Sequence, residues 1–452
     1  MKIMRGLWAV VACGALAVTG CSGHPDHHGK RGVDPEIAHQ IDAIWAIDNH
    51  AHPVLAPPQD ATDREFDALP VESLEPESPP PAYRNDFAQL PAAWKALWGF
   101  DATAPLDAAG QQRLNRARAR VKAREGEQFP AWVLDQAHIG TQVGNRVAMG
   151  FGVEPPRFRW VPYDDALLFP LDNSGLAAET PDRKEFFPLE DKVRARYLQA
   201  AGLTMVPATL DAYLSTVVTP TLERQRVGGA IAVKFEVAYL RGFDFGDPPQ
   251  AQAAKVYAKW AKSGVPDAAQ YKILQDFLFR YIAMESGRLG MAVHLHAMAG
   301  DGSYFGVAGV NPLLLEPLFN DRRLRKTNFV LLHGGWPYER ETAALLEKPN
   351  VYADISSQDL LMTPHTQAQW LREWLEWEPE KVLFGTDGYP FSDEMGWPES
   401  TWIASRNGRE ALGIALTGMV RDGEISRERA AELARLVLRG NAERLYGFTG
   451  AK

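Results

Sequence analysis

The chain has 452 residues, of which 46% are hydrophobic and 23% are charged, and its formal net charge at pH 7 is −9. This composition is typical of a globular protein long enough for one large domain with insertions or for two smaller domains. The negative net charge argues against a nucleic-acid partner, because binding to a phosphate backbone depends on clustered Lys and Arg residues.

The first twenty residues have the pattern of a targeting segment. Lys2 and Arg5 precede an apolar stretch, Leu7–Val18, which is shorter than a membrane span, and small residues come directly before Cys21. This order is typical of a secretory signal peptide. Its end resembles the bacterial lipobox, in which the cysteine becomes the lipidated first residue of the mature chain. An ordinary secretory signal that leaves Cys21 as a free thiol is the alternative.

These features predict a lipoprotein signal peptide over residues 1–20 and a polar tether over residues 21–35. They also predict a membrane anchor through lipidated Cys21 in the bacterial cell envelope. Cleavage would remove Cys13, the only other cysteine. The mature chain would then have no pair of thiols for a disulfide and no Cys-based metal site. Any metal would have to be bound by His, Asp, Glu or Lys.

The first motif with chemical content follows an apolar run at residues 41–47. Asp48–Pro53 contains His50 and His52, with one residue between them. Side chains two residues apart in a strand point the same way, so the two imidazoles would face one point at the C-terminal end of the strand. In a barrel of parallel strands, catalytic sites lie at that end. A chance surface pair is the alternative for such a motif taken alone.

Residues 56–85 are rich in proline and acidic residues and have no repeating apolar face, which predicts a long loop over the site. A helix over Phe87–Phe100 and a solvated basic helix around residues 113–124 follow. We expect residues 54–128 to form a large insertion. From Phe129 onward, short apolar runs alternate with amphipathic, helix-like segments.

This alternation predicts eight strands. The first, counted from Ile44, leads into the His-x-His pair, and the others lie at Thr141–Met149, Arg157–Asp164, Ala230–Ala238, Met291–Met298, Asn328–Gly334, Val351–Ser356 and Val382–Asp387. Apolar strands separated by helices are typical of a parallel sheet that is covered on both faces. Eight such units predict an α/β fold, a (β/α)8 TIM barrel over residues 36–448 with the large insertion after strand one.

Polar side chains recur in or at the ends of five of these strands. They are His50 and His52 in strand one, Lys234 in strand four, His294 and His296 in strand five, His333 in strand six and Asp387 in strand eight. Each has an ordinary structural explanation when it is taken alone. A barrel would bring all of them to one face, which favours a shared site.

Five segments carry a family resemblance. They are Ile47–Pro53, Lys234–Gly242, Val330–Pro337, Phe384–Tyr389 and Gly440–Tyr446. In these segments the chain resembles the amidohydrolase superfamily, and specifically its amidohydrolase-2 type. It is also similar to the amidohydrolase-like half of the fluG/nodulin-type fusions with glutamine synthetase. This chain has no synthetase half, so the ligase activity of those fusions does not carry over.

The resemblance implies a site for one or two divalent ions, with zinc favoured by imidazole and carboxylate donors. His50, His52 and Asp387 would bind the more buried ion, and His296 and His333 would bind a second ion or position the substrate. His294 would be a deeper residue. Lys234 occupies the position at which many members carry a carboxylated lysine that bridges two metals. An unmodified Lys234 is the alternative, with Glu236 as the fallback carboxylate.

The resemblance also suggests residues for catalysis and substrate binding. Asp387 would orient a water molecule, remove its proton and return the proton to the leaving group. Tyr239 and Arg241 are candidates for holding a substrate carboxylate, which Arg binds in a bidentate manner, although structural roles are equally compatible with the sequence. Trp336 and Tyr389 are candidate cavity walls. In the expected loop after strand eight, so are Trp397, Trp402, Arg406 and Arg409.

The resulting hypothesis is a metal-dependent hydrolase that cleaves an amide or related C–N bond of a small molecule in the cell envelope, using a metal-activated water. A metal-dependent decarboxylase of the amidohydrolase-2 type is the alternative, and it would favour one metal and an unmodified Lys234. A barrel that binds ligands without catalysis is a third hypothesis. The sequence leaves the substrate, the number of metal ions and a homo-oligomer open.

Overall fold

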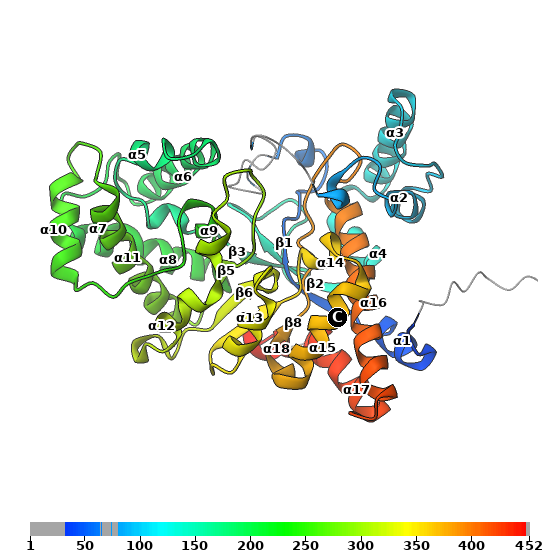
Figure 1. The fold of residues 1–452 in the computed structure, drawn as a ribbon. Coiled ribbons are helices and arrows are strands. Elements are labelled where there is room, and N and C mark those ends of the chain that lie inside the picture. The colour runs from blue at the N-terminus through cyan, green and yellow to red at the C-terminus, as the bar shows by residue number, and fades with distance from the viewer. Residues whose placement is uncertain (1–31, 64, 66–73, 75–79, 449–452) are drawn as a thin grey trace, which may run out of the picture.

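The computed structural model describes residues 32–63, 65, 74 and 80–448. Its strands are all parallel to their neighbours and form two sheets, β1-β2-β3 and β4-β5-β6-β7-β8 (Figure 1). Their bounds are β1 Ala46–Ala51, β2 Ile139–Asn145, β3 Phe158–Val161, β4 Ala232–Phe235, β5 Ala292–His296, β6 Phe329–Leu332, β7 Val351–Asp354 and β8 Val382–Leu383. Each overlaps one predicted strand, and β1 continues to Ala51, past His50.

Backbone hydrogen bonds connect the two sheets at both edges. Between the β3 and β4 segments, the Lys234 amide donates to the Pro162 carbonyl at 2.8 Å. At the other edge, the Asp387 amide donates to the His50 carbonyl at 2.8 Å. The strands therefore follow one another in chain order around a TIM-barrel-like α/β fold. The second of these bonds also joins two predicted site residues.

The space between the strands is filled by a compact apolar cluster to which all eight strands contribute. Its members on the strands are Ile47, Val143, Val161, Ala232, Ala292, Val330, Leu332, Tyr352 and Leu383. Ala442, Leu445 and Tyr446 of α18 (Asn441–Tyr446) and Phe448, just beyond that helix, pack against the same cluster. Layers of inward-facing apolar side chains are what a strand ring of this size requires, because its interior is a packed core and not a channel.

Helices cover the outer faces of the strands. On one side, Figure 1 shows α2 and α3 beside the long α16, and on the opposite side it shows a group that includes α5, α6, α7, α8, α10 and α11. The helices of the first half are α1 Pro35–Asp42, α2 Leu90–Trp98, α3 Ala108–Glu125, α4 Phe129–Gln136, α5 Ser174–Ala177, α6 Pro181–Ala200, α7 Leu210–Tyr213 and α8 Thr219–Val227.

The second half of the chain adds ten helices within the part that the structure describes. They are α9 Val237–Leu240, α10 Gln250–Trp260, α11 Ala268–Arg288, α12 Glu316–Phe319, α13 Glu339–Leu346, α14 Gln358–Leu361, α15 Pro364–Trp377, α16 Trp397–Arg421, α17 Arg427–Arg435 and α18. Several begin at side-chain caps: Asp107 accepts from the Gly110 amide before α3, and Asp267 accepts from the Gln270 amide before α11.

The segment after β8 is the largest difference from the sequence-based expectation. We expected a loop there, whereas residues 397–421 form α16, the longest helix described. Glycines at positions 408, 413 and 418 lower the helix propensity of this stretch. They have a packing role, because a Cβ on Gly408 would lie 3.2 Å from Asp359 and one on Gly413 would lie 2.8 Å from Val33. The helix needs these small residues to lie close to its neighbours.

Arg409 is therefore not a cavity wall, contrary to our expectation. Its guanidinium is buried under α16 and donates to the carbonyls of Ile41, Ile44 and His138 at 2.7–3.0 Å. These carbonyls precede β1 and β2, at the end of the strands opposite the predicted site. Trp397 is also buried away from the cavity, in the apolar cluster shared by α2, α3 and α16.

The predicted signal peptide, the Cys21 anchor and most of the tether lie outside the described residues. Within the described part, no helix combines the length and the apolar character needed to cross a membrane. The segment between β1 and β2 contains α2, α3 and α4, and its description as an insertion stays a prediction.

We predict that Arg409→Met lowers the free energy of unfolding by about 3 kcal/mol, because the buried Ile41 carbonyl and two half-buried carbonyls lose a charged donor. Arg406→Met is the matched control on the same helix, since the exposed Arg406 side chain only covers the Trp402 ring. It should cost about 0.5 kcal/mol or less. Urea unfolding of both variants would measure the difference, and equal costs would contradict the role given to Arg409.

Candidate metal centre

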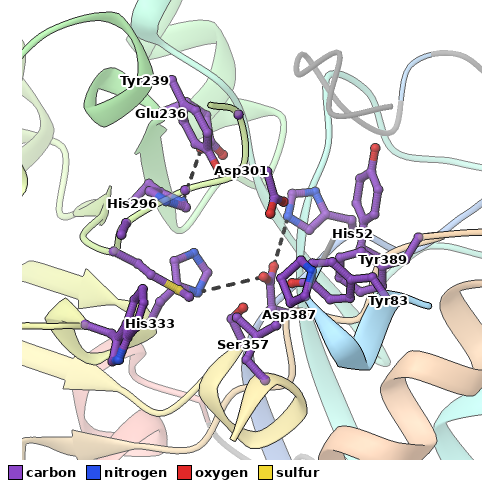
Figure 2. Close-up of a pocket in the computed structure, with 18 of the residues that line it drawn as sticks. His52, Tyr83, Glu236, Tyr239, His296, Asp301, His333, Ser357, Asp387 and Tyr389 are labelled. Atoms are coloured by element: carbon purple, nitrogen blue, oxygen red, sulfur yellow. Dashed lines mark ion pairs between the residues drawn. The ribbon is translucent and has the colours of Figure 1, made fainter. Parts of the chain in front are cut away.

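A cavity of about 600 Å³ opens at the C-terminal ends of the strands (Figure 2). Nine of the predicted site residues line it, namely His50, His52, Lys234, Tyr239, His296, His333, Trp336, Asp387 and Tyr389. They come from β1, β4, β5 and the segments that follow β1, β4, β6 and β8. The fold thus brings together residues that are more than 330 positions apart in the sequence.

Asp387 is the centre of the imidazole cluster. One of its carboxylate oxygens lies 3.2 Å from His50 Nε2 and 3.3 Å from His52 Nε2, and the other lies 3.9 Å from His333 Nδ1. One donor atom from each of His50, His333 and Asp387 lies within 4.8 Å of the others. Separations of this size can accommodate a single ion between the donors.

The backbone at Asp387 is held in an unusual conformation. Its φ is +51°, in the left-handed region that non-glycine residues rarely adopt. The Asp48 carboxylate accepts hydrogen bonds from both the amide and the hydroxyl of the preceding Thr386, at 2.8 and 2.6 Å. The Asp387 amide donates to the His50 carbonyl. These bonds hold the strained residue against β1, and such strain is typical of functional sites.

A second group of polar side chains lies across the cavity. Glu236 accepts from Lys234 Nζ at 2.5 Å, and its other oxygen lies 3.6 Å from His296 Nδ1. Lys234 Nζ also lies 3.3 Å from Asn145 Oδ1. These are the contacts of an ammonium donor with two acceptors. In this structure Lys234 therefore forms an ion pair with Glu236.

The electrostatics of the site favour neutral imidazoles and an ionised carboxylate. Burial and the nearby Lys234 charge lower the pKa of His50 well below its ordinary value, and burial lowers the pKa of His333 to about 4. Removal from water raises the pKa of Asp387, but the neighbouring His333, His50 and His52 outweigh this effect and hold its pKa well below the ordinary value. At neutral pH the imidazoles therefore retain lone pairs.

The donor set fits a divalent ion of the zinc type. Three imidazoles surround one carboxylate, and neutral His with Asp is an ordinary ligand combination for such an ion. Nε2 of the buried His296 has no hydrogen-bond partner among the described residues. A buried polar atom without a partner is costly unless something outside the chain satisfies it. His296 thus extends the candidate ligand set on the Glu236 side of the cavity.

Hydrogen bonds behind the imidazoles orient the rings. Ser356 Oγ donates to Asp354 at 2.6 Å and lies 2.8 Å from His333 Nδ1. Because the single hydroxyl proton is donated to Asp354, the serine oxygen accepts a hydrogen bond from the N–H of His333 Nδ1, which leaves the lone pair on Nε2. The Tyr163 hydroxyl lies 3.1 Å from His52 Nδ1 and contacts that ring from the side away from Asp387. Such outer contacts set the tautomer and orientation of metal-binding histidines.

Two of the residues in the predicted strand-end cluster and its flanking segments, Arg241 and His294, lie away from the cavity. Arg241, which we expected to hold a substrate carboxylate, forms an ion pair with Asp276 at 2.8 Å and covers the Phe245 ring. Because its guanidinium is paired with Asp276 of α11, Arg241 has a structural role in the contact between α11 and the segment after β4. His294 is fully buried and its Nε2 lies 2.7 Å from the Tyr446 hydroxyl, which agrees with the deeper position expected for it.

The structure adds cavity residues that we did not predict. Tyr83, Asp301 and Ser357 come from loops, whose paths carry no periodic signal in the sequence. Asp354 and Ser356, which contact His333 without lining the cavity, were not predicted either. They do carry a sequence signal, because they are polar residues at the end of the seventh predicted strand. The rule that selected His333 and Asp387 would have selected them too.

Comparisons with known proteins agree with this geometry. A model of an amidohydrolase family (Amidohydro_2) matches residues 188–448, more than half of the chain. Protein fluG of Emericella nidulans is 29% identical over 229 residues, which are 48% of this chain and 25% of that protein. The chain therefore spans about a quarter of the length of this curated relative.

Solved structures with the same fold include a proposed metal-dependent hydrolase from Lactobacillus casei, with a TM-score of 0.61, 16% identity and coverage of 92% of this chain and 98% of that one. Glucuronate isomerase from Caulobacter crescentus has a TM-score of 0.59 at 15% identity, covering 94% and 97%. Uronate isomerase from Thermotoga maritima has a TM-score of 0.54 at 12% identity, covering 94% and 100%. At these identities, the likeness shows the fold alone.

We predict that Ser356→Ala weakens zinc affinity by about 10- to 100-fold, because His333 loses the acceptor that sets its tautomer. Ser405→Ala is the matched control, since this buried serine donates to the Ala137 carbonyl far from the cavity. Competition titration against a chromophoric chelator would compare the two variants. Unchanged affinity in Ser356→Ala would show that the contact does not orient a ligand.

Proposed function

The chain belongs to the amidohydrolase family, and on that premise we propose that it is a metal-dependent hydrolase that cleaves an amide or related C–N bond of a small molecule. The observation that supports the proposal most strongly is the position of Asp387. It is an ionised carboxylate surrounded by three imidazoles at the end of a cavity large enough for a small molecule.

The ligands of one ion would be His50, His52 and Asp387, with His333 facing the same space. A divalent ion bound there supplies a Lewis acid that polarises a carbonyl oxygen and lowers the pKa of a water molecule. The residues of the chain supply the rest of the chemistry. Asp387 orients the water, accepts one of its protons as the oxygen bonds to the carbonyl carbon, and returns that proton to the nitrogen as the C–N bond breaks.

The ammonium contacts of Lys234 bear on the number of metal ions. In the conformation described, Lys234 forms an ion pair with one carboxylate oxygen of Glu236, and the other oxygen lies 3.6 Å from His296 Nδ1. A carboxylated Lys234 would lose its positive charge, and this pair would have to rearrange. Metal content and intact mass decide between an unmodified Lys234 with one ion and a carboxylated Lys234 with a second ion.

The same observation keeps the decarboxylase alternative open. A single ion and an unmodified lysine are the arrangement that we expect for that reaction. The decarboxylase would differ from the hydrolase in its substrate, which would be an acid that loses CO2. Assays for amine release and for CO2 release on the same protein separate the two reactions.

We also propose, from the sequence of residues 1–35 alone, that the enzyme acts in the bacterial cell envelope.

We predict that Asp387→Asn lowers turnover by about a thousandfold, because the amide cannot accept the proton of the attacking water. His52→Ala should abolish turnover through loss of a ligand. The zinc-loaded proteins would be tested for amine release from a panel of N-acyl amines and dipeptides. Circular dichroism would show whether both variants keep the fold. Full activity in either folded variant would contradict the proposed site.

A further inference from the structure

We propose that the cavity selects substrates that carry a positive charge beside an apolar or aromatic group, and that Asp301 binds this charge. This inference rests on the proposed function, because it names the substrate class of the same site. It replaces the expectation that an arginine holds a substrate carboxylate.

The described lining of the cavity offers no available cation to an anionic substrate group. Among the described residues that line it, Lys234 is the single Lys or Arg side chain. Its ammonium is fully buried and has Glu236 and Asn145 as partners. Arg241 lies outside this cavity in its ion pair with Asp276. A substrate carboxylate would therefore find no guanidinium or ammonium in the described lining of the cavity.

Asp301, on the loop after β5, supplies a further acidic side chain to the lining of the cavity besides those of Glu236 and Asp387. Figure 2 shows its carboxylate between the Tyr239 side of the cavity and the side that carries Tyr83 and Tyr389. Its charge acts on both walls: removal from water raises the pKa of the Tyr83 and Tyr239 hydroxyls, and Asp301 raises both further. A carboxylate that makes ionisation of its neighbours harder makes binding of a cation easier.

The loop that carries Asp301 is fixed on both sides. The Ala299 amide donates to the Trp336 carbonyl at 2.8 Å, and the Tyr304 amide donates to Asp182 at 2.9 Å. Gly300 lies directly against the Tyr239 ring, where any Cβ would collide with it. The position of Asp301 is thus set by backbone contacts, which is what recognition of a charged group requires.

The walls around Asp301 suit an organic cation better than a hydrated metal ion. Tyr83 is stacked on Phe391 with 4.0 Å between ring centroids, and Tyr389 contacts the same ring at 5.1 Å. Aromatic faces attract ammonium groups, and more strongly when these are removed from water. Apolar side chains complete the lining, namely Leu74, Met298, Leu361 and Met362. The carbonyl to be cleaved would then lie at Asp387 and the positive charge at Asp301.

A matched pair of probes tests the charge without turnover. The cation 3-(trimethylammonio)phenol and its uncharged isostere 3-tert-butylphenol differ by one nitrogen and one charge. The quaternary nitrogen has no lone pair, so it cannot act as a metal ligand. Isothermal titration of the full chain, with and without zinc, would compare wild type, Asp301→Asn and Glu347→Gln. The last variant removes an exposed carboxylate that does not line the cavity.

We expect wild type and Glu347→Gln to bind the cation about tenfold more tightly than the isostere, and Asp301→Asn to lose that preference. Binding of the isostere should be the same in all three proteins. Equal affinity of wild type for the two probes, or an unchanged preference in Asp301→Asn, would overturn the inference. Metal content and the turnover of Asp387→Asn are measured separately, so a failure here is distinguishable from a failure of the proposed function.

Discussion

The contact between the end of β1 and the segment after β8 is the constraint on which the site depends. The Asp48 carboxylate holds Thr386, and the His50 carbonyl accepts from the Asp387 amide. These bonds place a left-handed Asp387 beside two imidazoles from the other end of the chain. Without them, the carboxylate would lack a fixed position. The same contact is one of the two edges at which the strand ring is joined, so fold and site share it.

Burial gives the site its chemical character. Imidazoles taken out of water lose their affinity for protons, while Asp387 keeps its charge because histidines surround it. A lone pair on each ring and a full charge on the carboxylate are what a divalent cation needs. Ser356 and Tyr163 then orient the rings from behind. The selectivity that we infer lies in loops outside this ligand set, at Asp301 and the aromatic walls.

Much of the candidate site was predictable from the sequence, because strand periodicity and the C-terminal ends of parallel strands are local properties. His50, His52, His333 and Asp387 were found in this way. Arg241 could not be placed, because its partner Asp276 lies on a different helix and nothing in the sequence pairs them. Asp301 and Tyr83 lie in loops whose course depends on contacts such as that of Gly300 with Tyr239. The helix α16 was missed because its glycines serve packing against distant residues.

The metal content of protein purified without added metal or chelator tests the central claim most directly. Elemental analysis should find at least one equivalent of a zinc-like ion per chain, and the intact mass shows whether Lys234 is carboxylated. Chelation should remove the ion, and added zinc should restore it. A chain that contains no divalent metal and takes none up when zinc is added would contradict the account, whatever its fold.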